Sequence, residues 1–302
     1  MAATVLDKLT AQVGFIGLGL MGSRLTRRLD SFGWHVRAWN RTPKHADELN
    51  EWGIEIAPSV ADLVAGVDVV LSSLANDDAV RSVYLGKDGV FSTARPGTVI
   101  LEMSTISPVL SRQLHQEASA KGVKFLDVAI SGSTPAVEAG AITLLAGGDK
   151  ETFEQCVPIF ESIARQWFLI GPGSSGVKMK LVVNLVLGLD MEAIAEAVSL
   201  GEHLQIDQDV LLRVLSKTAV IAPAIIGKLQ KIKTNDYSPE FPLRLMSKDM
   251  DLVIDAATAS GAALPAASVA QTVFACNVPR SGNLDLSAIT PYVIGRGTKV
   301  EV

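Results

Sequence analysis

Short runs of β-branched and aromatic residues alternate with longer, polar, helix-prone segments over residues 13–170. This alternation is typical of βαβ units, in which a helix follows each strand and covers one face of a parallel sheet. Each run ends near a Gly, Ser, Asn or Asp, residues that favour turns. The pattern predicts strands at residues 13–16, 36–39, 67–72, 98–102, 125–128, 141–146 and 167–170. Seven strands in this span favour a doubly wound sheet.

The pattern changes at residues 171–176, whose sequence GPGSSG is the densest cluster of turn-forming residues in the chain. Strand-like runs stop there, so we expect a first domain at residues 1–173 and an all-helical second domain at residues 174–302. The predicted helices of the second domain lie at residues 177–203, 208–215, 243–260 and 267–276.

The predicted helix at residues 177–203 has apolar residues around most of its circumference, which a surface helix would not tolerate. Two explanations are equally compatible with this composition. The helix is the centre of one domain, or a second subunit covers part of it.

Composition narrows the class of protein. The chain has 302 residues with 48% apolar and 20% charged side chains, which excludes intrinsic disorder and suffices for two well-filled cores. A net charge of -5 argues against a nucleic acid as the main partner. The two cysteines, Cys156 and Cys276, are too few for a disulfide framework and lack the spacing of a zinc site, so we expect no metal and a reducing compartment.

We expect no membrane segment and a cytoplasmic protein. The longest apolar stretch, residues 181–189, is far shorter than the roughly 20 residues that span a bilayer. Residues 1–12 show neither an apolar core nor an arginine, so no leader peptide is expected there.

The sequence GLGLMG matches the GxGxxG pattern and stands between the first predicted strand and a helix-prone segment. Its first glycine permits a tight turn, its second lets backbone amides approach a pyrophosphate, and its third allows close helix packing. The predicted ligand-binding residues here are Gly17, Leu18, Gly19, Leu20, Met21 and Gly22. The alternative is a glycine-rich turn that binds no ligand.

The end of the second predicted strand indicates which dinucleotide binds. NAD-selective sites usually carry a carboxylate there, whereas this chain has Asn40, Arg41 and Thr42. An amide, a guanidinium and a hydroxyl can hold a 2′-phosphate through charge-assisted hydrogen bonds, so NADP (NADPH) is favoured over NAD. The alternative is that Arg41 is only a solvated loop charge.

Two further loops lie at the carboxyl ends of predicted strands, where ligands bind in open α/β sheets. They place Leu74, Ala75 and Thr105 near the cofactor. Thr105 could also cap the helix that begins near Pro108.

Lys180 and Asn184 stand out near the start of the long apolar helix. A lysine there is costly to bury without a partner, and residues four apart share a helix face, so the Asn184 amide could hold the ammonium or bond a substrate oxygen. A desolvated lysine exchanges protons more easily near neutrality. The alternative is that Lys180 extends to solvent. His35, His45, His115 and His203 lie in surface-type segments or at a helix end and are poor catalytic candidates.

Four ordered segments resemble the β-hydroxyacid dehydrogenase family, which includes 3-hydroxyisobutyrate dehydrogenase and the glyoxylate/succinic semialdehyde reductases. They are GFIGLGLMG from Gly14, DVAISGSTPAVEAGAIT from Asp127, GVKMKLVVN from Gly176 and KDMDL from Lys248. The resemblance covers nearly the whole chain. It implies a Rossmann-type α/β domain with a mainly parallel sheet, then an all-α domain on a long interdomain helix, and a homodimer or homotetramer built on that helix.

The resemblance also implies roles for individual residues. The substrate carboxylate is expected at Ser131 and Gly132, and the general acid/base at Lys180 with Asn184 as its partner. Lys248 is expected beside the cofactor and Asp249 at the active site, and Phe241 matches the aromatic residue over the pocket.

Ser133 and Thr134 stand where the family has a second glycine and a small apolar residue, and Ala129 replaces a proline. Ser133 could bond a polar substrate or satisfy a turn backbone. The leading hypothesis is an NADP-dependent oxidoreductase that reduces small aldehyde or keto acids, such as glyoxylate or succinic semialdehyde, to hydroxy acids, or that oxidises 3-hydroxy acids. The alternatives are imine reduction on the same scaffold and a non-catalytic nucleotide-binding interaction protein.

Overall fold

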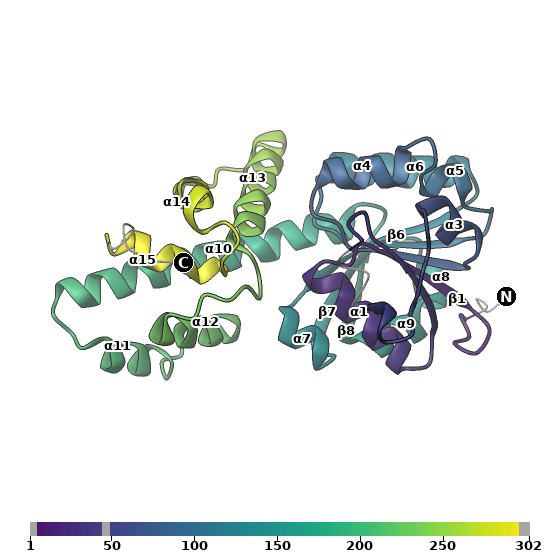
Figure 1. Ribbon diagram of the computed structural model, residues 1–302. Helices are drawn as coiled ribbons and strands as arrows, with labels where there is room; N and C mark the ends of the chain where they lie inside the picture. Colours follow the sequence, from purple (N-terminus) through teal and green to yellow (C-terminus); the bar gives the residue numbers. More distant parts are fainter. Residues whose placement is uncertain (1–4, 44–48, 296–302) are drawn as a thin grey trace. The chain divides into compact units, whose positions relative to one another are not determined.

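The computed structural model describes residues 5–43 and 49–295 and divides the chain into two compact units, Met1–Lys180 and Leu181–Val302 (Figure 1). The first unit is an α/β domain and the second is helical. The division between them lies within one continuous helix, α10 (Ser175–His203).

In the described part of the first unit, eight strands form one sheet in the order β3-β2-β1-β4-β5-β6-β7-β8. All neighbouring strands pair in parallel except β6 and β7, which are antiparallel. The strands are β1 (Gln12–Ile16), β2 (His35–Trp39), β3 (Glu55–Ile56), β4 (Val69–Ser72), β5 (Val99–Glu102), β6 (Lys124–Ser131), β7 (Ile142–Gly148) and β8 (Ala164–Gly171). The seven predicted strands are confirmed with shifted ends, and β3 was missed because two residues give no periodic pattern.

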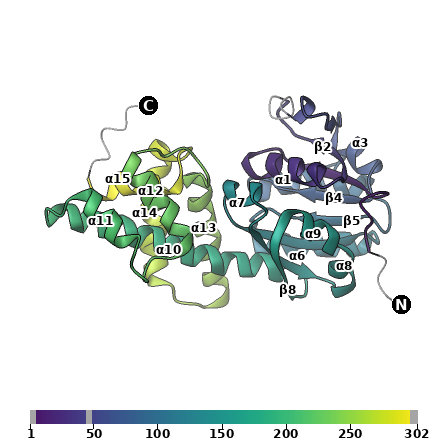
Figure 2. The same cartoon turned by 90° about the horizontal axis from the view of Figure 1, so that it is seen from below.

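Helices cover both faces of this sheet (Figure 1, Figure 2). On one face pack α3 (Val60–Ala65), α4 (Asp77–Leu85), α5 (Val90–Thr93) and α6 (Pro108–Ala120), around a core that includes Leu63, Tyr84 and Leu114. On the other face pack α1 (Leu20–Ser31) and α9 (Val157–Ile163), with α8 (Lys150–Gln155) beside them, and α7 (Thr134–Glu138) contacts α1. The mainly parallel Rossmann-type domain is therefore confirmed.

Strand β6 contributes side chains to the hydrophobic cores on both faces of the sheet. Leu126, Val128 and Ile130 belong to the core beneath α1 and α9, while Phe125 belongs to the core beneath α6. Because side chains alternate along a strand, Asp127 and Ser131 point to the same face as Phe125. An acidic side chain is thus placed under a helical layer.

The second unit is built around the C-terminal part of α10 (Figure 2). Around it pack α11 (Gln208–Leu215), α12 (Pro223–Thr234), α13 (Leu243–Ser260), α14 (Pro265–Ser281), the 3-10 turn η1 (Leu286–Ile289) and α15 (Thr290–Val293). The predicted ends of α11 and α13 are confirmed, whereas α14 is longer than expected and α12 was missed. Helix α12 has recognisable signals, Pro223 in its first turn and Asn235 in the left-handed conformation at its C-cap.

Glycine at position 188 allows α10 and α13 to pack closely. A Cβ added at Gly188 would come within 2.6 Å of the Met250 sulfur. Within the part of the chain that the structure describes, no helix combines the length and apolarity needed to cross a membrane.

Candidate active site

The turn between β1 and α1 requires glycine at two positions and leaves open space at a third. Gly17 has φ of +93°, and a Cβ there would collide with the Ser73 carbonyl. A Cβ at Gly22 would collide with the carbonyl oxygen of Gly17. At Gly19, by contrast, an added Cβ meets nothing within 4 Å. The turn therefore holds a cradle beside Gly19.

The residues of this cradle fit the pyrophosphate of a dinucleotide. Gly19 is the N-cap of α1 and has no side chain with which to occupy the first backbone N–H groups of the helix. Unoccupied N–H groups at a helix N-terminus bind anions well. Leu20 and Met21 form the start of the helix, and Leu74 packs against the position of Gly17, so the loop after β4 lies at the same turn.

Asn40 braces the glycine turn from the end of β2. Its Oδ1 accepts a hydrogen bond from Leu18 N at 2.9 Å, and its Nδ2 donates to the Thr42 carbonyl at 2.8 Å. The amide is thus engaged with the backbone, while Arg41 and Thr42 are exposed beside it. His45 lies outside the described residues, and His35 is exposed on β2.

The loops after β4 and β5 are tied to each other. Ser104 Oγ accepts from Leu74 N at 2.7 Å, and Ala75 follows exposed on the same loop. The N-cap of α6 is Ser107, whose Oγ accepts from Leu110 N at 3.1 Å, so the expectation that Thr105 caps this helix is wrong. Thr105 is partly buried on the loop after β5, and its role beside the cofactor stays a prediction.

Glu102 ends β5 and is fully buried in this region. The pKa of its carboxyl group is raised to about 8, chiefly by burial and also by the nearby charge of Asp127, while hydrogen bonds from Ser104 oppose the shift. Its Oε1 accepts from Ser104 N at 3.0 Å and lies 3.4 Å from the Ser72 hydroxyl. The carboxyl group is therefore protonated at neutral pH.

The predicted substrate segment follows β6. Ser131 is the last residue of the strand, and Gly132 has φ of +151° with Ile142 Cγ2 only 2.7 Å from an added Cβ. Ser133 is the N-cap of α7 by position, but its side chain makes no capping hydrogen bond. Of the two roles considered for Ser133, side-chain satisfaction of the turn is therefore not observed.

An ion pair joins the predicted substrate segment, through α7, to helix α1, which follows the glycine turn. Arg24 Nε on α1 contacts Glu138 Oε1 on α7 at 2.6 Å, and Arg28 Nη1 donates to the Glu138 carbonyl at 3.1 Å. The guanidinium of Arg28 also fills the space beside Gly140. These contacts thus link α1, which follows the glycine turn, to the predicted substrate segment.

Lys180 lies in the second turn of α10 with 8% of its surface exposed. The alternative of a lysine extended into solvent does not match this burial. Asn184, one helical turn later, is fully buried, and its Nδ2 donates to Asp249 Oδ2 on α13 at 2.5 Å. Its Oδ1 is buried with no hydrogen-bond donor among the described residues.

Asp249 links two of the predicted residues. Its Oδ1 lies 2.7 Å from the Lys248 ammonium, while its other oxygen accepts from Asn184. Asp249 is buried and Lys248 is partly exposed. The structure thus brings Asn184 together with the adjacent residues Lys248 and Asp249, which follow it by more than sixty positions in the sequence.

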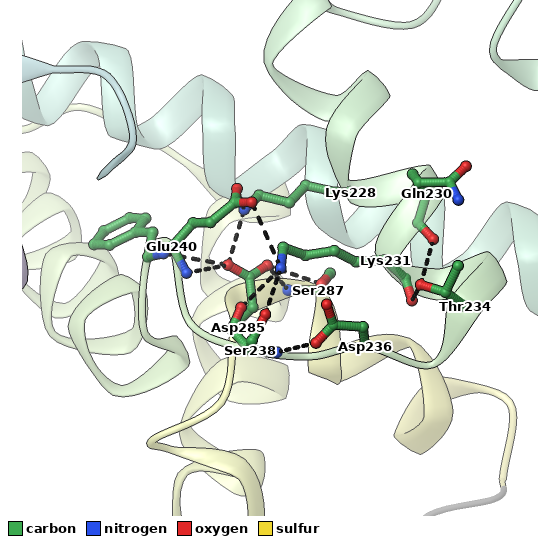
Figure 3. A network of polar contacts seen from close by, with 10 residues as sticks. Lys228, Gln230, Lys231, Thr234, Asp236, Ser238, Glu240, Asp285 and Ser287 are labelled. Atoms are coloured by element: carbon green, nitrogen blue, oxygen red, sulfur yellow. Dashed lines mark hydrogen bonds and ion pairs between the residues drawn. The ribbon is translucent and has the colours of Figure 1, made fainter. Parts of the chain in front are cut away.

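Phe241 is held by a buried network that sequence reasoning missed (Figure 3). The network joins Lys228, Glu240 and Asp285, with Lys228 Nζ at 2.8 Å from Asp285 Oδ2 and 2.9 Å from Glu240 Oε2. The same Asp285 oxygen accepts from Phe241 N at 3.2 Å. Lys231 Nζ also contacts the loop between α12 and α13, where it donates to the Ser238 carbonyl at 2.8 Å.

His115 is a second feature that the sequence did not reveal. It was expected in a surface-type segment, but its Nε2 lies 2.7 Å from Oδ1 of the fully buried Asp127. An acidic residue within an apolar strand run, Asp127, was the available signal. His203 bonds the carbonyl of Ser199 on its own helix. Among the residues described, no three His, Cys, Asp or Glu side chains form a group that could hold a metal.

A glycine cradle at the first β-to-α turn of a mainly parallel sheet, together with a buried lysine on the long helix that leads into a helical unit, is typical of a dinucleotide-binding oxidoreductase. Residues 12–171 match the family model for the NAD binding domain of 6-phosphogluconate dehydrogenase. Residues 174–293 match the model for the NAD-binding domain of NADP-dependent 3-hydroxyisobutyrate dehydrogenase.

Curated relatives and solved structures agree with this class. Glyoxylate/succinic semialdehyde reductase 1 of Arabidopsis thaliana is 33% identical over 93% of this chain and 98% of its own. NAD-dependent L-serine dehydrogenase of Pseudomonas aeruginosa is 34% identical over 87% of this chain and 91% of its own. The Mycobacterium tuberculosis 3-hydroxyisobutyrate dehydrogenase structure with L-serine has a TM-score of 0.82 and 30% identity, covering 94% of this chain and 99% of its own. The chain belongs to the β-hydroxyacid dehydrogenase family.

Proposed function

We propose that this β-hydroxyacid dehydrogenase reduces small aldehyde or keto acids with NADPH, and that Lys180 supplies the proton. Glyoxylate and succinic semialdehyde are the first substrates to test, because a relative that is 33% identical is named for both. The observation that carries the proposal is the burial of Lys180 one helical turn from Asn184, whose Oδ1 is buried and has no donor within the part of the chain that the structure describes.

The chain's own residues account for proton transfer and for substrate orientation. A bound nicotinamide cofactor supplies the hydride. Lys180 donates a proton to the oxygen that becomes the alcohol, as a general acid must when a carbonyl is reduced. Asn184 orients the reacting oxygen or the lysine, and Asp249 fixes the Asn184 amide through the hydrogen bond to its Nδ2. Ser131 and Gly132 bind the substrate carboxylate through a hydroxyl and backbone N–H groups.

The preference for NADP rests on the end of β2. Asn40 has no negative charge and is engaged with Leu18 and Thr42, while Arg41 is exposed next to it. A guanidinium at this place favours a 2′-phosphate. One relative is named NAD-dependent and one matching family model is named for an NADP-dependent enzyme, which supports an argument about dinucleotide choice from such local residues.

The role of Lys180 is tested by measuring NADPH oxidation with glyoxylate and succinic semialdehyde. We expect Lys180→Ala to lower kcat by at least about a hundredfold while the Kd for NADPH stays within about twofold. Lys178→Ala is the matched control, because Lys178 is exposed two positions earlier on the same helix. Turnover of Lys180→Ala at the parent rate would contradict the proposal.

Cofactor choice is tested with Arg41→Ala. We expect it to weaken NADPH binding by about tenfold and to leave NADH binding within about twofold, because only NADPH carries the phosphate that the guanidinium would bind. Isothermal titration with both dinucleotides measures the difference. Equal losses for the two dinucleotides would refute the preference for NADP.

A further inference from the structure

Asp127 is a fully buried carboxylate that contacts the start of α10. Its Oδ2 accepts a hydrogen bond from Val177 N at 2.8 Å, and its Oδ1 accepts from Ser174 N at 2.8 Å. The third contact is His115 Nε2 from α6, 2.7 Å from Oδ1. Both oxygens therefore face donors, and two of these donors are backbone N–H groups at the N-terminus of α10.

The backbone around Asp127 is shaped to receive it. A Cβ at Gly147 would come within 2.6 Å of Oδ1, and one at Gly176 within 2.9 Å of Oδ2, so glycine leaves the room that the carboxylate needs. Ser174 has φ of +68°, a conformation that is unfavourable for a residue with a side chain. Strain of this kind persists where surrounding contacts impose it, and the hydrogen bond from Ser174 N to Asp127 is such a contact.

Strand β6 and helix α10, which are in contact at Asp127, carry the proposed substrate-binding residue Ser131 and the proposed proton donor Lys180. Strand β6 continues from Asp127 to Ser131, and both side chains point to the same face of the sheet. Helix α10 continues from Val177 to Lys180, less than one turn later. The carboxylate thus connects the strand that ends at the predicted substrate site with the helix that carries the proposed proton donor, and all these residues lie in the first unit.

We propose that Asp127, with His115 as its hydrogen-bond partner, is a positioning residue that fixes the N-terminal turn of α10 and thereby sets the place of the Lys180 ammonium relative to Ser131. This inference rests on the proposed function of Lys180. A carboxylate at a helix N-terminus also interacts favourably with the helix dipole, which strengthens its hold on the first turn. Small displacements of a catalytic group cost large factors in rate, so loss of this hold lowers kcat more than it lowers cofactor binding.

The test is Asp127→Asn in the full-length protein. An amide has one acceptor and one donor group, so its NH2 must face either the Val177 N–H or the Ser174 and His115 donors. We expect kcat with the best substrate to fall by about tenfold to a hundredfold. The Kd for NADPH should stay within about twofold, because the glycine turn between β1 and α1 is not touched.

Asp149→Asn is the matched control for a purely structural effect. Asp149 Oδ2 accepts from Thr152 N at 2.8 Å and caps α8 in the same unit, but α8 carries none of the proposed functional residues. Both variants should lower the melting temperature, and only Asp127→Asn should lower kcat. A kcat of Asp127→Asn within about twofold of the parent would overturn the proposal.

Two further variants keep the outcomes distinguishable. If Lys180→Ala retains the parent rate, the proposed function fails, whereas loss of activity in Lys180→Ala with full activity in Asp127→Asn contradicts only the positioning role. Should Asp127→Asn not fold, His115→Phe removes one donor and keeps a ring against Phe125, whose centroid is 4.7 Å from that of His115. We expect His115→Phe to lower kcat by about threefold or more, and an unchanged kcat there would refute the inference.

Discussion

The glycines of the first β-to-α turn are not equivalent. At two of them a side chain would clash with the backbone, and at the third the space is open. Gly17 and Gly22 are required by the protein itself, because a side chain at either position would collide with a backbone carbonyl. At Gly19, an added Cβ would meet no atom of the described residues within 4 Å. This open space leaves room for a ligand to approach the backbone closely, as the second glycine of GxGxxG does in dinucleotide-binding turns.

This separation gives a prediction for Gly19→Ala and Gly22→Ala. We expect Gly19→Ala to keep the melting temperature within about 2 °C of the parent and to weaken NADPH binding by about tenfold or more, because the added methyl group occupies the cradle. Gly22→Ala should lower the melting temperature clearly, since its methyl group collides with the Gly17 carbonyl. Thermal unfolding with and without NADPH measures both effects, and tight NADPH binding by Gly19→Ala would contradict the cradle.

Glu102 predicts how stability depends on pH. Its pKa is raised from 4.5 to about 8 in the folded protein, so between these values the folded state holds a proton that the unfolded state has lost. Stability from this group is therefore present below pH 4.5 and is lost as pH rises towards 8, by up to about 1.4 kcal/mol per pH unit. Glu102→Gln, which cannot ionise, should unfold with a flatter pH dependence between pH 5 and pH 8 in urea titrations. An identical slope for parent and variant would show that Glu102 is ionised in the folded state.

At the scale of elements, the loop that carries Phe241 is stabilised by charge. Lys228 on α12 and Asp285 before η1 form a pair whose side chains are almost completely buried (Figure 3). Backbone N–H groups of Glu240, Phe241 and Ser287 also donate to Asp285, so the carboxylate organises the loop between α12 and α13. Removal of one partner of a buried pair leaves the other charge without compensation.

We therefore expect Lys228→Met to lower the free energy of unfolding by about 3 kcal/mol. Lys233→Met is the matched control, because Lys233 lies on the same helix and pairs with Asp209 at 3.3 Å with both side chains exposed. Its loss should cost less than about 1 kcal/mol. Urea denaturation of the three proteins measures the difference, and equal costs would show that the buried network adds nothing.

The sequence predicted elements better than it predicted contacts. The helices at 208–215 and 243–260 have the expected ends, because strong periodicity is a local signal. The hydrogen bonds that define the structural roles of Asn40 and Asp127 could not be predicted, because they join residues far apart in the sequence. Asn40 bonds Leu18, 22 positions away, and Asp127 bonds Val177, 50 positions away. Likewise, Thr105 and Ser107 both carry hydroxyl groups that can cap a helix, so the sequence did not decide between them. The hydrogen bond from Leu110 N to Ser107 Oγ identifies Ser107 as the N-cap of α6.

At the scale of the whole molecule, apolar side chains remain exposed along α10. Leu200 is 61% exposed and Leu204, just after the helix, is 63% exposed, while Val182 and Val186 form a second exposed pair at helical spacing. Exposed apolar residues that share a helix face indicate a surface buried by association. The apolar circumference noted in the sequence is therefore not buried by the described chain alone.

We expect the protein to self-associate through this surface as a dimer or tetramer. Size-exclusion chromatography with light scattering should give a multiple of the 32.0 kDa chain mass. The double variant Leu200→Glu/Leu204→Glu should shift the mass towards a single chain, because burial of carboxylates without partners is unfavourable. A single-chain mass for the parent would refute this expectation.

The division between the two units within α10 restricts how this protein can be recombined with its relatives. Lys180 is the last residue of the first unit, and it follows directly from the turn that Asp127 holds. A chimera that joins the α/β half of one homologue to the helical half of another at residue 173 would pair a foreign α10 with this Asp127. A crossover placed after Lys180 keeps this lysine with strand β6, whose Asp127 contacts the start of α10. We therefore expect active chimeras when the crossover lies inside α10 rather than in the glycine-rich loop before it.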